Sequence, residues 1–415
     1  MEFALDFVFY YPLFMAYLWM IGGIYYYFHW ERPEGRAPDN PPELPEYPFV
    51  SILIPCFDEG DNVRETIASA HAQEYPDFEV IAINDGSTDE TAAILDELRS
   101  TYPRLRVIHH ATNQGKAMGL RMGALAAQGE YLICIDGDAL LDPHATTWMV
   151  RHFVSGGRVG AVTGNPRIRT RSTLLGKIQV GEFSAIIGLI KRTQRIYGRV
   201  FTVSGVVTAI RKTALHRIGY WSTDMVTEDI DVSWALQRDH WDVRYEPNAL
   251  CWILMPETLR GLWRQRLRWA QGGVEVLKKY GTSLLQWRKR RMWGVVLEHL
   301  TSATWAYMVA ATIVLWAAGL FFPVPEPFYV RTILPEWYGV LLGFTCLLQF
   351  ATSLMIDGRY EKGLAPHYYW MVWYPIAFWL INVVSTVAAV PRALFKPRGT
   401  RAVWVSPDRG LRPVQ

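Results

Sequence analysis

The stretch Tyr131–Asp142 reads Y-L-I-C-I-D-G-D-A-L-L-D, and the interpretation of the whole chain begins with it. Its first five residues are almost wholly apolar, which is typical of a strand buried on both faces. Asp136-Gly137-Asp138 follows directly, and we expect Gly137 to turn the backbone so that both carboxylates point at one place. Adjacent carboxylates at a buried strand end are costly without a positive partner. A divalent cation shared with phosphate oxygens suits such a pair; a solvated acidic loop is the alternative.

The composition indicates a water-soluble domain joined to membrane segments. Of the 415 residues, 50% are hydrophobic and 20% are charged, and the mean hydropathy is +0.05. This is too apolar for an ordinary soluble enzyme and too charged for a chain lying wholly in a membrane. A net charge of +3 gives no case for nucleic-acid binding. The four cysteines have no metal or disulfide spacing, and we expect buried, reduced side chains at Cys56, Cys134, Cys251 and Cys346.

The N-terminal residues 1–31 are predicted to form a transmembrane helix. Phe7–Phe28 contains no charged residue and is long enough to span roughly 30 Å of hydrocarbon. Arg32 and Arg36 follow this segment, so the positive-inside rule places the N-terminus outside and the next domain in the cytoplasm. Residues 32–48 form a Pro-rich linker.

Residues 49–256 alternate between strand-like and helix-like segments, which predicts an α/β domain with a parallel, doubly wound sheet. The helices are expected at Asn62–Gln73 and Ser87–Thr101, the second opening on the capping signal S-T-D-E-T. The strands are expected at Val50–Ile54, Glu79–Asn84, Arg106–His110 and Tyr131–Ile135.

Polar residues follow each of these strands. In parallel sheets ligands bind beyond the carboxyl ends of the strands. Pro55-Cys56-Phe57-Asp58-Glu59 follows the first strand, Asp85-Gly86-Ser87 the second, and Asn113-Gln114-Gly115-Lys116 the third. Together with Asp136 and Asp138 they predict a site for a nucleotide with a diphosphate.

These motifs carry a resemblance to a known family. P-C-F-D-E, N-D-G-S-T-D, N-Q-G-K-A and D-G-D, followed by T-E-D at 227–229 and Q-R-L-R-W at 265–269, resemble the processive, membrane-embedded family 2 glycosyltransferases. The chain is most similar to a branch that polymerises N-acetylglucosamine through β-1,6 linkages, as indicated by G-N-P-R-I-R-T-R-S, V-T-E-D-I-D, I-L-M-P-E-T-L, Q-R-L-R-W-A-Q-G-G and the terminal W-V-S-P-D-R-G. It departs at the start, with one hydrophobic segment where relatives often have two.

The resemblance implies a GT-A-type, Rossmann-like cytoplasmic domain with transmembrane and interfacial helices. It implies a UDP-N-acetylglucosamine donor and a divalent cation, magnesium or manganese, bound by Asp138 with Asp136 nearer the ribose. Asp85 would contact the nucleoside and Phe57 would lie near the uracil. The implied donor and acceptor contacts are Pro55, Phe57, Glu59, Asp85, Lys116, Asp136, Ser204 and Gly205.

The resemblance also makes Asp229 the general base, beside Glu228, in an inverting single displacement. On the residues alone, Thr227-Glu228-Asp229 could instead cap the helix-like run Val232–Arg238. Trp269 would lie under the acceptor sugar, with Gln265 and Arg268 facing the diphosphate or the acceptor end.

Two nearby segments are less specific. Gly164–Arg199 contains eight Arg and Lys residues among apolar ones, and we interpret it as an amphipathic helix with its charges in water. A surface near anionic headgroups or a regulatory phosphate is the alternative. The small-residue loop Phe201–Gly205 either approaches the acceptor sugar or simply ends a strand.

The C-terminal half is predicted to return to the membrane. Residues 257–292 contain an aromatic and basic helix, Glu257–Lys279, suited to the membrane interface. Residues 293–390 hold three apolar segments, Trp293–Phe322, Trp337–Ile356 and Tyr368–Val390, with Glu298 and His299 expected to face protein or a wet channel.

The side of the membrane that holds the basic tail, residues 391–415, follows from two conflicting rules. Counting spans places the tail outside, whereas its arginines place it inside. Pro375 could break the last segment into two short pieces. We follow the charges.

The leading hypothesis is therefore processive transfer of N-acetylglucosamine to a polysaccharide, with export across a bacterial inner membrane for a biofilm matrix. The alternatives are a chitin, hyaluronan or cellulose type of polymer, a single-sugar transfer to a lipid phosphate, and a non-catalytic nucleotide-sensing membrane protein. The resemblance further implies membrane lipid, a small membrane accessory subunit, and cyclic di-GMP at a composite surface that includes tail arginines such as Arg398 and Arg401.

Overall fold

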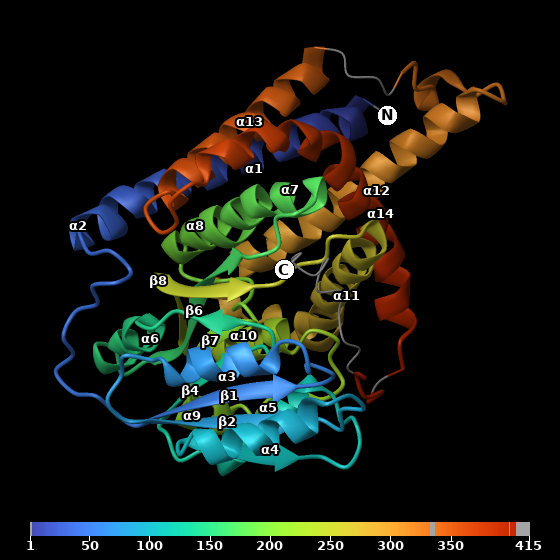
Figure 1. Ribbon diagram of the computed structural model, residues 1–415. Coiled ribbons are helices and arrows are strands. Elements are labelled where there is room, and N and C mark those ends of the chain that lie inside the picture. Colours follow the sequence, from blue (N-terminus) through green and yellow to red (C-terminus); the bar gives the residue numbers. More distant parts are fainter. Residues whose placement is uncertain (1, 333–336, 398, 404–415) are drawn as a thin grey trace.

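The computed structural model describes residues 2–332, 337–397 and 399–403. An α/β domain built on an eight-stranded sheet occupies one half of the molecule, and long apolar helices cover its upper side (Figure 1). The strands are β1 (Val50–Cys56), β2 (Phe78–Asn84), β3 (Leu105–His109), β4 (Tyr131–Ile135), β5 (Leu140–Leu141), β6 (Val159–Ile168), β7 (Val207–Arg211) and β8 (Asp242–Ile253).

The helices of the α/β domain are α3 (Val63–His71), α4 (Thr91–Thr101), α5 (Lys116–Ala126), α6 (Ala145–Val154), α7 (Leu174–Phe183), α8 (Lys191–Ile196), α9 (Lys212–Arg217) and α10 (Glu228–Arg238), with the π-helix η2 (Ser184–Ile190) between α7 and α8. The remaining helices are α1 (Glu2–Tyr26), η1 (Tyr27–Glu31), α2 (Arg32–Glu34), α11 (Leu259–Leu284), η3 (Trp287–Met292), α12 (Trp293–Gly319), η4 (Glu326–Phe328), α13 (Trp337–Asp357), η5 (Ala365–Trp373) and α14 (Tyr374–Phe395).

The sheet has the order β3-β2-β1-β4-β7-β6-β8-β5. Its first four strands are parallel, and Val50 pairs with both Phe78 and Tyr131. The prediction of a parallel sheet is confirmed for these strands and for the pair β6 and β8. It is wrong for β7, which runs antiparallel to both β4 and β6, and for β5, which runs antiparallel to β8. Strand–helix alternation continues beyond β4, since α6 precedes β6 and α10 precedes β8. The alternation pattern therefore does not reveal the reversed direction of β7.

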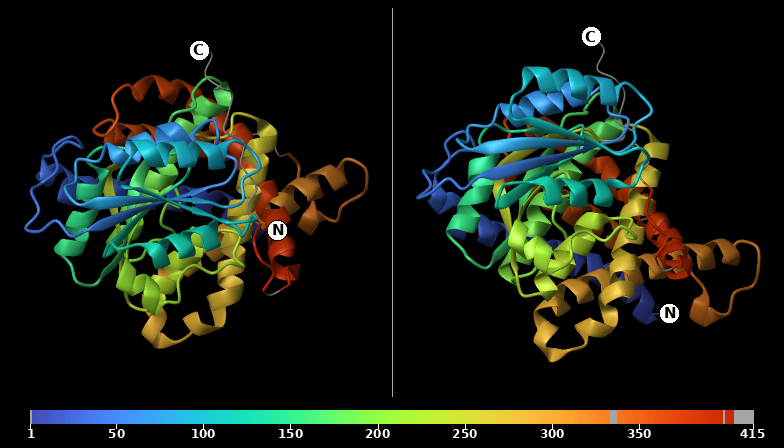
Figure 2. Two further views of the ribbon diagram at one scale, coloured as in Figure 1. Left: turned by 60° about the horizontal axis from the view of Figure 1, so that its bottom comes forward. Right: turned by 90° about the horizontal axis from the view of Figure 1, so that it is seen from below.

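Two apolar cores, one on each face of the sheet, hold the domain together. Alternate residues of a strand face opposite sides, so Ile52 packs with α3 and α6 while the adjacent Leu53 packs with α5 and α10. Figure 2 shows the sheet between these two helix layers. The four cysteines are free and buried, as predicted.

The start of α4 corrects one expectation. The signal S-T-D-E-T predicts a helix from Ser87, but α4 begins at Thr91. The Asp89 carboxylate accepts the Thr91 N–H at 3.0 Å, and the Ser87 hydroxyl accepts the N–H of Asp58 at 3.0 Å. Ser87 therefore joins the loops after β1 and β2 rather than capping a helix.

The basic stretch Gly164–Arg199 corrects a second expectation, because it is not an amphipathic helix with solvated charges. It contains the second half of β6 together with α7, η2 and α8, and it buries Arg167 and Arg192 completely or nearly so. Arg167 lies 2.6 Å from Asp357 of α13, and Arg192 lies 2.9 Å from Asp357 and 2.5 Å from Glu31 of η1. These partners lie more than 150 residues away in the chain, where a local pattern cannot reveal them.

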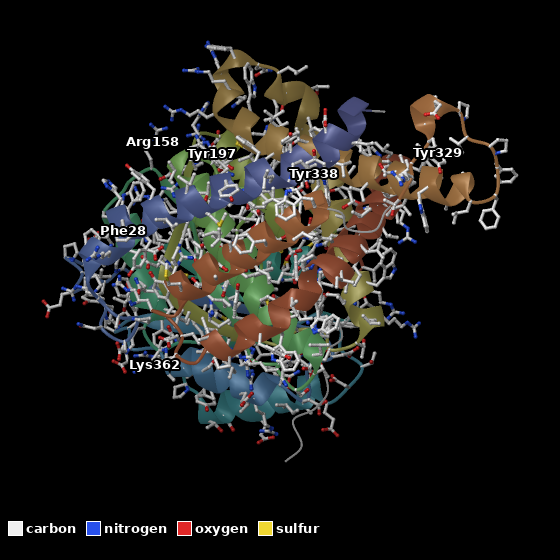
Figure 3. The ribbon with its side chains drawn as sticks, turned by 90° about the horizontal axis from the view of Figure 1, so that it is seen from above. Phe28, Arg158, Tyr197, Tyr329, Tyr338 and Lys362 are labelled. Carbon is white, nitrogen blue, oxygen red and sulfur yellow. The ribbon has the colours of Figure 1, made fainter. Side chains whose placement is uncertain are left out.

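Within the part of the chain that the structure describes, four helical segments are long and apolar enough to cross a membrane: Leu5–Glu34, Trp287–Gly319, Trp337–Asp357 and Ala365–Phe395. Seen from above, α1 and α13 lie side by side, with Tyr338 beside α1 and Phe28 toward the other end of α1 (Figure 3). Near the N-terminal ends of these helices, the rings of Phe9 and Tyr338 are 4.7 Å apart. At the other ends, Glu31 and Asp357 both pair with Arg192, so the two helices run parallel.

Helix α12 runs antiparallel to α1. The Tyr11 hydroxyl donates to the Glu298 carbonyl at 3.4 Å, and the Trp305 indole donates to the Val8 carbonyl at 2.9 Å. The Glu298 carboxylate accepts from the Tyr197 hydroxyl at 2.5 Å, so it faces protein as expected.

The aromatic and basic helix predicted at Glu257–Lys279 is present as α11, which packs along α14. Its basic residues are not all at the surface. Arg266 is buried and forms an ion pair with Glu182 of α7, so α11 is fastened to the α/β domain through its cationic face as well as its apolar one.

Candidate active site

Asp136-Gly137-Asp138 directly follows β4, as predicted. Gly137 does not have a positive φ, which corrects the expectation of a sharp glycine turn. A Cβ at Gly137 would lie 3.1 Å from the Pro55 carbonyl oxygen and 2.9 Å from Cγ of Glu59. The glycine is needed because the loop after β1 packs directly against the acidic strand end.

Lys116 gathers several of the predicted residues around one ammonium group. Its Nζ lies 2.6 Å from Asp136 Oδ1 and 3.0 Å from Glu228 Oε1, and it donates to the Gly205 carbonyl at 3.2 Å. Burial alone would lower the pKa of Lys116, but the carboxylates of Asp136 and Glu228 outweigh burial and raise it. The lysine is therefore charged, and it joins the ends of β4 and α10 to the loop before β7.

Asp229 lies in the first turn of α10, facing that same loop. Its Oδ2 accepts the N–H of Gly205 at 3.2 Å, and its Oδ1 accepts the N–H of Ile230 at 2.9 Å. Burial and the neighbouring Glu228 raise the pKa of Asp229 to about 6, against the charges of Lys116 and Arg268. A carboxyl group of this kind takes up a proton near neutral pH, as a general base must.

Glu228 has the opposite shift. Burial would raise its pKa, but the ion pair with Lys116 outweighs burial and lowers it. Neighbouring carboxyl groups whose pKa values are driven apart are suited to different roles. Glu228 remains ionised against Lys116, while Asp229 is free to exchange a proton.

Asp85 is fully buried and shapes the loop that leads to Lys116. Its carboxylate accepts the N–H groups of Gln114 at 2.9 Å and Gly115 at 2.7 Å, and it lies 2.7 Å from Nδ1 of His110. The predicted contact of Asp85 with the nucleoside stays a prediction. His110 was not anticipated, although it ends the segment Arg106–His110 at the same sheet edge as Asp85.

The loop after β1 is held against the start of α4. The Glu59 N–H donates to the Thr91 hydroxyl at 2.8 Å, and the Glu59 carboxylate accepts from the Asn62 amide at 3.4 Å. Pro55 is buried at the end of β1, and Phe57 is half-buried in the loop. These residues border the edge at which Asp85 and Asp136 lie.

Three predicted residues come from α11. Arg268 is exposed, and its charge lowers the pKa of both Glu228 and Asp229, which places it near the acidic pair. The Trp269 ring packs against Phe183, with centroids 6.3 Å apart. The Gln265 amide nitrogen lies 3.7 Å from the sulfur of Met255.

Two glycines of α11 explain how the T-E-D and Q-R-L-R-W motifs come together. A Cβ at Gly272 would overlap the side chain of Thr227, and one at Gly273 would lie 2.6 Å from the imidazole of His299. The Q-G-G sequence in Q-R-L-R-W-A-Q-G-G thus permits α10 and α12 to approach α11 closely.

The arrangement of acids fits a cation that is completed by a ligand. In the described part of the chain, no three His, Cys, Asp or Glu side chains converge to hold a metal by themselves. Burial and the adjacent Asp136 raise the pKa of Asp138, so a nearby cation would favour its ionised form. Magnesium and manganese sites of nucleotide enzymes commonly combine one or two carboxylates with substrate phosphates, and the Asp-Gly-Asp end of β4 fits that pattern.

The C-terminal tail reaches this edge of the domain. Arg401 binds the Gln114 side chain, and the Ala402 N–H donates to the Thr223 carbonyl at 2.9 Å. Arg398, Arg409, Arg412 and the W-V-S-P-D-R-G run lie outside the described residues.

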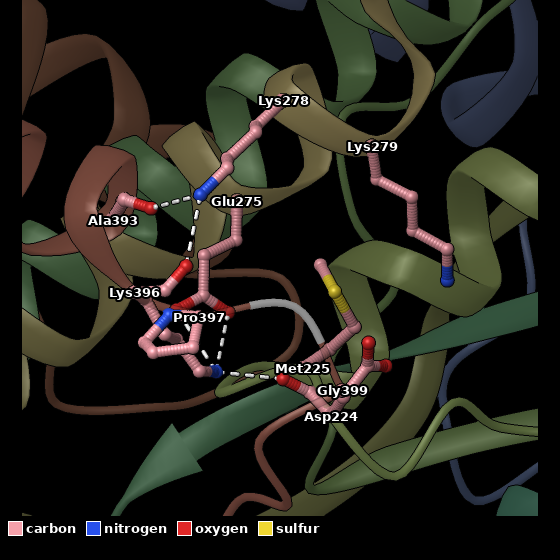
Figure 4. Close-up of a pocket in the computed structure, with 9 residues that line it drawn as sticks. All are labelled: Asp224, Met225, Glu275, Lys278, Lys279, Ala393, Lys396, Pro397 and Gly399. Atoms are coloured by element: carbon pink, nitrogen blue, oxygen red, sulfur yellow. Dashed lines mark hydrogen bonds and ion pairs between the residues drawn. The ribbon is translucent and has the colours of Figure 1, made fainter.

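A cavity of about 330 Å³ lies where the tail leaves α14, apart from the Lys116 cluster (Figure 4). Lys396 bridges it by donating to the Asp224 carbonyl at 2.6 Å and pairing with Glu275 at 3.1 Å. Lys278 donates to three carbonyl groups at the end of α14. The cavity therefore belongs to the junction between α11, α14 and the tail.

The mixed sheet, its acidic strand ends and the acidic pair on α10 define a nucleotide-sugar glycosyltransferase with a GT-A-like fold. Residues 45–272 match the family model described as "Glycosyltransferase like family 2". A mannosyltransferase from Pyrobaculum calidifontis, solved in complex with GDP-mannose and Mn²⁺, has the same fold with a TM-score of 0.60, at 18% identity over 94% of this chain and 99% of that one.

The curated relatives narrow this class. The poly-β-1,6-N-acetyl-D-glucosamine synthase of Staphylococcus epidermidis is 40% identical over 411 residues, and that of Staphylococcus aureus strain MSSA476 is 38% identical over 407 residues, each match covering 98% of both chains. The chain belongs to glycosyltransferase family 2 and, within it, to the family of the poly-β-1,6-N-acetyl-D-glucosamine synthases.

Proposed function

We propose that the protein transfers N-acetylglucosamine from UDP-N-acetylglucosamine to the end of a growing β-1,6-linked polysaccharide. The observation that supports this most directly is the Lys116 cluster, which joins the acidic end of β4 to the acidic pair of α10. The Asp229 carboxylate takes the proton from the acceptor hydroxyl, whose oxygen attacks the anomeric carbon of the donor. The bond from that carbon to the diphosphate breaks, UDP leaves, and the configuration inverts.

The donor lies, in this proposal, along the edge formed by the loops after β1, β2 and β4. A divalent cation at Asp138, with Asp136 beside it, would neutralise the diphosphate when bound. Lys116 adds a second positive charge from α5, and Asp85 keeps the backbone of Gln114 and Gly115 in place. Trp269 offers an aromatic face to the acceptor sugar.

The membrane arrangement follows from the contacts of the helix ends. α1 and α13 would cross in the same direction and α12 in the opposite one, with the α/β domain in the cytoplasm of a bacterial cell. One end of Ala365–Phe395 contacts the α/β domain, where Lys177 of α7 lies 5.0 Å from the Trp370 ring, and the other end contacts α11, where Lys278 binds the carbonyls that end α14. Helix α11 is itself fastened to the α/β domain by the ion pair of Arg266 with Glu182. This segment would therefore lie at the interface without crossing, which accounts for a basic tail on the inner side.

The finished chain would leave through the membrane part for use in a biofilm matrix. A small membrane subunit fits the exposed faces of α12, in which Val295 and Ala306 are the buried residues of the described chain. A response to cyclic di-GMP at a surface shared with that subunit, near Arg401, completes the proposal.

The experiment that tests the function measures polymer formed by purified protein in detergent. Radiolabelled UDP-N-acetylglucosamine should be incorporated into a product cleaved by a β-1,6-N-acetylglucosaminidase, and EDTA should abolish incorporation until magnesium or manganese is restored. Equal incorporation of UDP-glucose, or a product cleaved only by chitinase or hyaluronidase, would contradict the proposed substrate or linkage. Activity unchanged by EDTA would remove the cation from the mechanism.

A further inference from the structure

A buried lysine, Lys191, lies outside the sequence motifs that define the family. Lys191 begins α8 directly after the π-helix η2, and only 3% of it is exposed. Its ammonium group donates one hydrogen bond, to the Thr163 hydroxyl of β6 at 3.0 Å. A buried ammonium carries a large desolvation cost and has three N–H donors. We therefore expect this buried lysine to have a function that offsets its desolvation cost.

A chain of hydrogen bonds leads from Lys191 to the acidic pair. The Thr163 hydroxyl also accepts the N–H of Ser204 at 2.8 Å, and the Ser204 carbonyl accepts from the Thr208 hydroxyl at 2.5 Å. The next residue, Gly205, donates its N–H to Asp229. Lys191 and Asp229 therefore hold the two sides of one loop.

We propose that Lys191 is a positioning residue for sugar transfer, which holds the loop Ser204–Gly205 against Asp229 through Thr163 and favours the ionised form of the Asp229 carboxylate. The inference rests on the proposed role of Asp229 as the base. Burial lowers the pKa of Lys191 to about 7, and the negative charge of Asp229 partly opposes that effect, so the two groups interact electrostatically.

Other charged groups that affect the pKa of Asp229 belong to different elements from Lys191. Lys116, Glu228 and Arg268 act on Asp229 from α5, α10 and α11. From β8 the Tyr245 ring faces Arg192, 5.5 Å from its guanidinium carbon, and not Lys191.

The position of Lys191 also depends on the membrane helices. The adjacent Arg192 points to the other side of α8, where it pairs with Glu31 of η1 and Asp357 of α13. Of these two consecutive residues, Lys191 is thus linked through Thr163 to the loop Ser204–Gly205, and Arg192 contacts η1 and the end of α13. π-helical turns are frequent at functional sites, and η2 ends at the residue before Lys191.

The test compares pH profiles of UDP release for Lys191→Met and the wild type. Removing the positive charge raises the pKa of Asp229, so the acid limb of the turnover profile should move to higher pH. A shift of one pKa unit lowers turnover on that limb about tenfold. Above about pH 7 Lys191 is itself neutral, so this part of the difference should shrink there. UDP affinity should not change.

Two further variants keep the inference testable. Thr163→Val keeps the lysine but removes the hydroxyl that links Lys191 to Ser204, so turnover should fall at every pH, including above about pH 7, where the charge of Lys191 no longer contributes. Lys177→Met, which removes another lysine of the α7–α8 segment, should behave as wild type. A purely structural Lys191 would reduce the yield of folded protein but leave the turnover and the pH profile of the folded fraction unmoved, and that result would overturn the inference.

If Lys191→Met does not fold, wild-type turnover by Thr163→Val overturns the inference instead. The proposed function fails separately: full turnover by Asp229→Asn would remove the base, whatever Lys191→Met does. Loss of turnover in Asp229→Asn with an unmoved profile in Lys191→Met would remove the Lys191 inference alone.

Discussion

Among single residues, Asp229 has two possible roles that one substitution separates. Asp229→Asn keeps the shape and the hydrogen bond from Gly205 but cannot take a proton. General-base catalysis contributes roughly 10²–10⁴-fold, so turnover should fall by about that factor while UDP still binds. Because Asn caps helices about as well as Asp, a residue that only caps α10 would leave the variant nearly active. UDP release and UDP affinity, measured on one preparation, decide between the roles.

The wild-type pH profile and a neighbouring acid supply the controls for this prediction. The pKa of Asp229 is raised to about 6, and the base acts when ionised, so turnover should fall as the pH drops through about 6. Asp231, also in the first turn of α10, lies 2.7 Å from Lys279 and accepts from the Tyr280 hydroxyl. Asp231→Asn should therefore cost stability but keep the turnover of folded protein.

The residues of the site differ in how far the sequence reveals them. Asp136, Lys116 and Asp229 lie next to strand or helix ends whose periodicity is visible, so their convergence at one sheet edge could be predicted. Gly137 could not be interpreted correctly, because its reason is a contact with Pro55 and Glu59 of another loop. Lys191 is one of several cations in the basic stretch Gly164–Arg199, and its partner Thr163 belongs to β6, which is not among the strands that the sequence predicts.

At the level of elements, the buried ion pairs of Arg167 and Arg192 with Asp357 fasten α13 to the α/β domain. Removing one member of a buried ion pair leaves an uncompensated charge, which typically costs about 3–5 kcal/mol. Asp357→Asn should therefore shorten the half-life of folded protein in detergent steeply at elevated temperature. The control is Glu97→Gln, which breaks the exposed pair with Arg64, because solvent-exposed pairs contribute little to stability.

Equal half-lives for these two variants would contradict the assignment of Asp357 as a fastening residue.

The same pairs show why elements beyond β4 were harder to predict. The sequence of Gly164–Arg199 shows cations between apolar residues, which is the pattern of a solvated amphipathic helix. The structure gives two of those cations acidic partners in η1 and α13, so that tertiary contact overrides the local pattern.

At the scale of the whole molecule, the apolar helices and the α/β domain form one connected structure. The N-terminal helix, the interfacial α11 and the apolar segments at 293–390 were predictable from length and charge, because spans follow simple rules. Whether the last segment crosses was not predictable, since hydropathy does not distinguish a span from a helix that returns to the interface. The contact of Lys278 with the end of α14, and that of Lys396 with the Asp224 carbonyl, support the second arrangement.

Cysteine labelling in right-side-out membrane vesicles tests that arrangement. All four native cysteines are buried, so the wild type serves as the blank. If α12 and α13 cross and α14 does not, a membrane-impermeant maleimide should label Glu326→Cys, which lies between α12 and α13. It should not label Thr400→Cys in the tail or Gly157→Cys in the α/β domain until the vesicles are permeabilised. Labelling of Thr400→Cys in sealed vesicles would mean that Ala365–Phe395 crosses the membrane and that its contacts with α11 and α7 do not hold in the bilayer.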